Sequence, residues 1–240
     1  MRGFLKVYWP LILIAAIGLV IALMYVEPGP PKRVAFAAGS PGGAYHAYAE
    51  RYQALLAEND VTVDLIDTNG SLDNLRLLEE GDADIGLVQG GLAQARDADA
   101  MESLGGLFYE PFWVFVSADS EATGFADLRQ ARMAIGSEGS GTRQLALALR
   151  SEFGGAWAAS TNETLSGSAA AAALLAGDLD AAVFSAAIEA PYVDQMLRDP
   201  RVRLLAFDRA SALGRRAPAL APVTLLRGVV DIGRDLPATT

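Results

Sequence analysis

Three short stretches of the sequence combine glycine with hydroxyl or amide side chains, as turns that bind an anion do. They are residues 39–45 (GSPGGAY), 69–74 (NGSLDN) and 136–142 (GSEGSGT). Glycine lets backbone N–H groups approach a ligand, and the start of a helix offers unpaired N–H donors at the positive end of its dipole. We predict that the three turns together hold a carboxylate or a related anionic group. The alternative is that Ser71 and Thr142 only cap the helices that follow them.

The residues that are missing exclude most covalent and cofactor chemistry. Among 240 residues there are no cysteines, one histidine (His46) and two lysines (Lys6 and Lys32). The chain therefore has no Cys-ligated metal site and no P-loop lysine, and a Gly-x-Ser-x-Gly nucleophile elbow is also missing. The net charge of −10 argues against nucleic-acid binding. We expect a protein that is not an enzyme, with no catalytic residue, no metal and no cofactor.

Short apolar runs alternate with amphipathic stretches, which is typical of an α/β protein. The expected strands are 34–38, 61–66, 85–88, 112–117, 132–135, 181–184 and 202–207. The expected helices are 44–57, a helix that follows residues 69–71 and ends at about 80, and then 142–153, 168–176 and 191–197. Each of the three glycine turns therefore joins the end of a strand to the start of a helix.

One segment of the chain recurs. Residues 77–88 (LLEEGDADIGLV) return in reduced form as 174–184 (LLAGDLDAAVF), with Gly177 placed 96 residues after Gly81. Each copy indicates a helix ended by glycine, an Asp-x-Asp turn and a buried strand. This pattern is either common α/β punctuation or the sign of two similar lobes with a ligand cleft between them. The acidic pairs in the two turns are expected to solvate the turns rather than bind a metal.

The N-terminal region has the composition of a membrane anchor. Residues 7–26 carry no charge, and as a helix they would span roughly 30 Å, the thickness of a bilayer core. Arg2 and Lys6 precede this run, and a proline-rich linker at 27–31 follows it. A cleaved signal peptide is the alternative, but residues 23–27 lack the small residues of a cleavage site. We predict a retained transmembrane helix, with the rest of the chain outside the cytoplasm.

Four segments follow one another in an order that resembles the TAXI family, the solute receptors of tripartite ATP-independent periplasmic (TRAP) transporters. They are residues 39–45, 70–84, 109–114 (YEPFWV) and 139–143 (GSGTR), and the resemblance covers about residues 34–237. It implies a two-lobed, type II periplasmic-binding-protein-like fold. The implied function is to bind a small organic anion, either a dicarboxylate or an amino acid such as glutamate. The receptor would then deliver this ligand to TRAP permease subunits.

Matched to the family, the first ligand turn contributes Ser40, Gly43 and Tyr45, the second Ser71 and Asn74, and the third Ser140, Gly141 and Thr142. Arg143 is a further candidate because a cation at the start of a helix opposes the dipole, which suggests pairing with an anionic ligand or an acidic side chain. A simple surface arginine is the alternative. The sequence departs from the family at Ala44, where threonine is frequent.

The resemblance also predicts how the chain is divided. We expect an anchor and linker at 1–31, a first lobe at 32–112, a second lobe at 113–205, and a return segment to the first lobe at 206–240. The last strand and helix of the family fold are expected to be missing. The predicted location is the inner membrane, with the globular part in the periplasm. Two alternatives remain: a sensor or degenerate receptor without a transport role, and an enzyme on the same bilobal scaffold.

Overall fold

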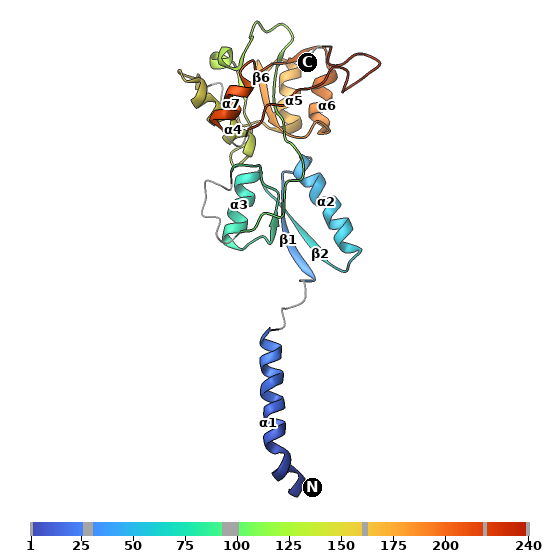
Figure 1. Ribbon diagram of the computed structural model, residues 1–240. Helices are drawn as coiled ribbons and strands as arrows, with labels where there is room; N and C mark the ends of the chain where they lie inside the picture. The colour runs from blue at the N-terminus through green and yellow to red at the C-terminus, as the bar shows by residue number, and fades with distance from the viewer. Residues whose placement is uncertain (1, 26–30, 93–100, 160–162, 218–219, 239–240) are drawn as a thin grey trace. The chain divides into compact units, whose positions relative to one another are not determined.

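The computed structural model describes residues 2–25, 31–92, 101–159, 163–217 and 220–238, and it divides the chain into two compact units (Figure 1). The first unit, Met1–Lys32, contains helix α1 (Arg2–Tyr25). Within the described residues, no helix meets the length and apolarity needed to cross a membrane. The predicted transmembrane helix is therefore not confirmed. The second unit, Arg33–Thr240, contains two sheets.

The first sheet is parallel, with strand order β2-β1-β3. Its strands are β1 (Arg33–Gly39), β2 (Thr62–Asp67) and β3 (Ile85–Gly86), and its helices are α2 (Ala44–Ala57) and α3 (Ser71–Glu80). Figure 1 shows α2 and α3 on either side of the strands. Apolar side chains of β1 and β2, among them Phe36 and Val63, pack against Ala49 of α2. This arrangement brings the ends of β1 and β2 to one edge of the sheet, where the predicted ligand turns follow.

The second sheet is mixed, with strand order β5-β6-β4-β7. Its strands are β4 (Phe112–Ser117), β5 (Met133–Ala134), β6 (Ala181–Ser185) and β7 (Val202–Leu204). Its helices are a 3-10 helix (Phe125–Gln130), α4 (Gly141–Phe153), α5 (Gly167–Ala176), α6 (Pro191–Arg198) and α7 (Ala210–Arg216). Alternate residues of β4 pack into two cores, Trp113 and Phe115 into one, Val114 and Val116 into the other. Both faces of this sheet are thus covered, which explains why the strand is apolar throughout.

The chain after β7 contacts the second sheet. Phe207, Leu213 and Leu220 pack against the core that contains Val114, and the Arg198 guanidinium donates a hydrogen bond to the carbonyl of Val230 (2.9 Å). None of these contacts joins residues 206–240 to the first lobe, where the sequence predicted that they would return. The expected domain boundaries stay predictions.

The recurring segment has the same structure in both copies. Its helices α3 and α5 each end at a glycine in the left-handed conformation, with φ of 76° at Gly81 and 82° at Gly177. In each copy the N–H of this glycine donates to carbonyls in the last turn of the helix. A side chain at these positions would be strained, so glycine ends both helices at the same place. The similarity is therefore structural as well as sequential.

The aspartates that follow these glycines join each turn to a neighbouring strand. The Asp84 carboxylate accepts the backbone N–H of Ala35 (2.8 Å), and the Asp180 carboxylate accepts that of Arg132 (2.7 Å). The two bonds are equivalent in the two copies. In the part of the chain that the structure describes, no group of three His, Cys, Asp or Glu side chains could hold a metal ion.

Candidate functional site

The first and third ligand turns share one backbone geometry. In each turn the first and fourth residues are glycines with positive φ. They are Gly39 (78°) and Gly42 (76°) in the first turn, and Gly136 (98°) and Gly139 (82°) in the third. The first turn is closed by a hydrogen bond from the Gly43 N–H to the Ser40 carbonyl (2.9 Å). A Cβ at Gly43 would lie 2.9 Å from that carbonyl oxygen, so the turn needs glycine there. Helices α2 and α4 then begin at equivalent points.

The second and third turns contact each other directly. The backbone N–H of Leu72, in the first turn of α3, donates to the carbonyl of Gly139 (3.1 Å). A Cβ at Gly70 would lie 3.4 Å from the Cα of Ser140. A carbonyl next to the second sheet therefore satisfies one of the unpaired donors at the start of α3.

A second link between the two lobes runs through Gln89 and Ser185. The Gln89 side-chain amide donates to the Ser185 hydroxyl (2.8 Å), and the Gln89 backbone N–H donates to the Ser71 hydroxyl (3.0 Å). The backbone N–H of Ser185 donates in turn to the Thr142 hydroxyl (3.2 Å). Ser71 is only 2% exposed. The predicted site residues Ser71 and Thr142 are thus joined through Gln89, three residues after β3, and Ser185, the last residue of β6.

Helix capping does not explain Ser71 and Thr142. The N-cap of α3 is Gly70, which has no side-chain cap, and the N-cap of α4 is Ser140. The Ser140 hydroxyl accepts the backbone N–H of Arg143 (3.2 Å). Ser140, and not Thr142, therefore caps α4.

Gln89 and Ser185 were not among the site residues predicted from the sequence. They occupy equivalent positions, 96 residues apart, one residue beyond the two copies of the recurring segment. Extending the comparison of the copies by one residue would have identified both as polar residues at the end of a buried strand.

Tyr45 and Glu110 extend this network. The Tyr45 hydroxyl donates to the Glu110 carboxylate (2.7 Å) and lies 3.4 Å from the Ser71 hydroxyl oxygen. Burial raises the pKa of Glu110 to about 7, although the hydrogen bond from Tyr45 opposes this change. Burial, reinforced by the charge of Glu110, also raises the pKa of Tyr45. Glu110 entered the sequence analysis only as part of segment 109–114, because nothing in its immediate neighbours indicates burial of its carboxyl group.

The field of Glu110 extends to the second lobe. Burial, with the charge of Glu110 as the second cause, raises the pKa of Tyr192 on α6 to about 12. Tyr192 is 8% exposed. No ion pair joins Glu110 to an arginine, lysine or histidine of the described residues.

Three other predicted site residues make further contacts around this network. The Asn74 side chain, fully buried in α3, donates to the Leu87 carbonyl (2.7 Å) and accepts the Thr68 hydroxyl. The Arg143 guanidinium reaches back to the Gly136 carbonyl (3.1 Å) and so supports the third turn. Gly141 leaves room for Gln89, whose side-chain oxygen would lie 2.2 Å from a Cβ at that position.

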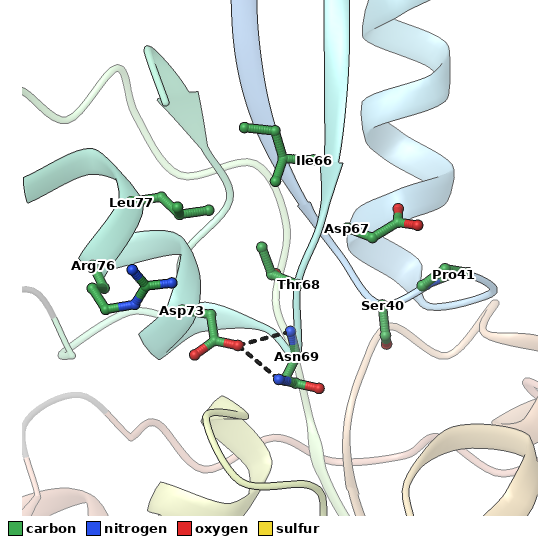
Figure 2. A pocket seen from close by; sticks show the side chains of 9 residues that line it. All are labelled: Ser40, Pro41, Ile66, Asp67, Thr68, Asn69, Asp73, Arg76 and Leu77. Atoms are coloured by element: carbon green, nitrogen blue, oxygen red, sulfur yellow. Dashed lines mark hydrogen bonds between the residues drawn. The ribbon is translucent and has the colours of Figure 1, made fainter. Parts of the chain in front are cut away.

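Ser40 lies apart from the network, beside a hollow on the first lobe (Figure 2). The hollow has a volume of about 380 Å³ and is lined by Ser40, Pro41, Ile66, Asp67, Thr68, Asn69, Asp73, Arg76 and Leu77. Figure 2 shows Asp73 accepting two hydrogen bonds from Asn69 (3.1 and 2.8 Å). Arg76 pairs with Glu80. The charged groups of Asp73 and Arg76 thus have partners within the first lobe, and the hollow contains one of the nine predicted site residues.

The fold is that of the two-lobed periplasmic binding proteins. The alkanesulfonate-binding protein of Xanthomonas axonopodis pv. citri, solved with MOPS, matches with a TM-score of 0.51 and 22% identity over 75% of this chain. The chain spans 62% of that protein's length. An ancestral arginine-binding protein, solved with arginine, matches with a TM-score of 0.53 and 15% identity, covering 73% of this chain and 79% of that one. The regulatory domain of CcmR from Synechocystis, solved with 2-PG, matches with a TM-score of 0.52 and 14% identity, covering 74% of this chain and 81% of that one.

Residues 36–235 match the model of the NMT1-like family, and the chain belongs to this family. A comparison with curated protein sequences finds no match.

Proposed function

We propose that this protein is an extracytoplasmic solute receptor that binds a small organic anion between its two lobes. The observation that supports this most is the meeting of the turns at the lobe junction, where Leu72 bonds to Gly139 and Gln89 bonds to Ser185. Ligands of open α/β sheets bind beyond the carboxyl ends of the strands, which is where these turns lie. The receptor role is non-enzymatic, so bound solute is released unchanged.

The groups that join the lobes are also the groups that would hold a carboxylate. When the lobes separate, the Leu72 N–H, the Gln89 amide and the Ser185 hydroxyl lose their partners. A ligand carboxylate that accepts these bonds would replace the direct contacts and draw the lobes together again. Hydrogen bonds to a charged group are stronger than those between neutral groups, so the exchange favours an anionic ligand. Neutral donors also permit release, which transport requires.

Delivery and location are the further parts of this proposal. The resemblance of the four turn and strand segments to TAXI receptors supports delivery of the ligand to a TRAP permease. The uncharged run at 7–26 supports attachment to the inner membrane, with residues 32–240 in the periplasm. Two neighbours in fold were solved with a small solute, MOPS in one and arginine in the other.

Calorimetry tests the binding mode. Thermal-shift screening against dicarboxylates, amino acids and sugars first identifies a ligand, which is then titrated into the wild type, Gln89→Ala and Ser185→Ala, each of which removes one of these side-chain donors. Losing one hydrogen bond to a charged group costs about 1.5–3 kcal/mol, so each variant should bind roughly tenfold more weakly or worse. Ser168→Ala, on an exposed part of α5, is the matched control and should bind normally. Unchanged affinity in both test variants would place the site elsewhere.

A further inference from the structure

Glu110 stands where the chain passes from one lobe to the other. It lies two residues before β4, the first strand of the second sheet along the chain. Its carboxyl group accepts the hydroxyl of Tyr45, on α2 of the first lobe (2.7 Å). The charge of Glu110 also reaches Tyr192, on α6 of the second lobe, whose pKa it raises as the second cause after burial. Helices of both lobes therefore surround one partly buried carboxyl group.

These surroundings favour a neutral carboxylic acid. Among the described residues, the titratable groups that face Glu110 are the phenols of Tyr45 and Tyr192, and burial is the main cause that raises the pKa of each. No arginine, lysine or histidine of this part of the chain forms an ion pair with Glu110. Burial without an opposite charge disfavours the ionised carboxylate. The pKa of Glu110 therefore rises to about 7, although the hydrogen bond from Tyr45 opposes the rise.

The burial of Glu110 depends on the two lobes being together. Tyr45 belongs to the first lobe and Tyr192 to the second, so separating the lobes takes at least one of them away and admits water. A hydrated glutamate has its ordinary pKa, which is 4.5. Between the two pKa values, the carboxyl group is ionised when the lobes are apart and protonated when they are together.

We propose that Glu110 couples closure of the lobes to the uptake of one proton, which passes from solvent to its carboxylate as the lobes meet. This inference rests on the proposed function, in which the lobes separate and close again around the solute. Closure on an anionic solute would then bring the solute's negative charge next to a neutral acid, and the repulsion between two carboxylates would be avoided. Acidic conditions favour the closed form, and alkaline conditions favour opening and release.

The two pKa values set the size of the effect. Protonation of Glu110 favours the closed form in full below pH 4.5, and this advantage is lost as the pH rises through about 7. The ratio of closed to open molecules should therefore fall about 30-fold between pH 5.5 and pH 8.5.

Distances between spin labels measure this ratio without a ligand. The labels are attached to the full-length protein at Asp82→Cys and Asp178→Cys, two exposed turn positions on the first and second lobes. The distance distribution should be narrow at pH 5.5 and broad at pH 8.5. Glu110→Gln is uncharged at both pH values, so its distribution should stay narrow at pH 8.5. Tyr45→Phe removes the hydrogen bond that lowers the pKa of Glu110, so the midpoint of the pH response should move to higher pH.

His46→Gln is the matched control. Histidine is the side chain that ordinarily changes charge in this pH range, and His46 is the one histidine of the chain. It contacts Glu50 and Asp67, which both belong to the first lobe, so these contacts do not cross the junction. The pH response should therefore persist in His46→Gln.

The outcomes separate this inference from the proposed function. A distribution that is equal at the two pH values, a response that persists in Glu110→Gln, or one that is lost in His46→Gln would overturn the role of Glu110. If Glu110→Gln fails to fold, an unchanged midpoint in Tyr45→Phe would do the same. These measurements use no solute, so their failure leaves the receptor role in place. Failure of the proposed function would instead appear as the absence of any bound carboxylate in the thermal-shift screen.

Discussion

Replacing Glu110 with glutamine should stabilise the protein at alkaline pH. Burial raises the pKa of Glu110 from 4.5 to about 7, so the folded protein binds this proton more tightly than the unfolded chain. The tighter binding of this proton adds to the free energy of unfolding in full below pH 4.5, and this contribution is lost as the pH rises through about 7. Each pKa unit is worth about 1.4 kcal/mol, so the ionised carboxylate lowers the free energy of unfolding by about 3 kcal/mol at pH 8.

Urea unfolding of the wild type and Glu110→Gln at pH 5 and pH 8, followed by tryptophan fluorescence, measures this effect. At pH 8 the variant should be more stable by about 2–3 kcal/mol, and at pH 5 by less than about 1 kcal/mol. Glutamine cannot release a proton but still accepts the Tyr45 hydrogen bond, so the comparison isolates the charge. The exposed control Glu121→Gln should change little at either pH. An advantage of Glu110→Gln that is absent at pH 8, or equal at the two pH values, would refute the reasoning.

Three other predictions follow from the fold. Asn74→Ala should lower the free energy of unfolding by about 2–3 kcal/mol, because the half-buried Leu87 carbonyl and Thr68 hydroxyl lose their partner, whereas the exposed Asn59→Ala should cost less than about 1 kcal/mol in the same urea titration. Gly81→Ala and Gly177→Ala should each cost about 1 kcal/mol, and clearly unequal losses would contradict the structural equivalence of the two copies. A reporter that is active only outside the cytoplasm, fused after residue 240, should give activity in the membrane fraction; activity confined to the soluble periplasm would indicate cleavage.

The sequence predicted most of the local structure because the signals were local. The predicted helix 44–57 and the strand 112–117 coincide with α2 and β4, and the helix predicted to follow Ser71 begins in the structure at Ser71 itself and ends at Glu80, as α3. Glycines at the helix ends and continuous apolar runs set these boundaries. The 3-10 helix and α7 were not predicted, since six or seven residues are too few to show helical periodicity. The strand predicted at 85–88 is shorter, with pairing only at Ile85–Gly86.

The partners within the site could not be predicted, because they depend on which distant segments meet. Nothing near Ser71 indicates that its hydroxyl accepts the N–H of Gln89, and nothing near Tyr45 indicates an acid 65 residues away. The turn glycines, by contrast, were recognisable from the backbone conformations they allow. The sequence thus identified the turns, and the structure supplied the contacts between them.

Lobe movement on ligand binding tests the central claim most directly. The chain has no cysteine, so spin labels can be attached at Asp82→Cys and Asp178→Cys, two exposed and equivalent turn positions on the first and second lobes. Distances between the labels are measured with and without the carboxylate that binds most tightly in the screen. A ligand held between the lobes should convert a broad distance distribution into a narrow one. A distribution that is unchanged at saturating ligand would contradict binding between the lobes.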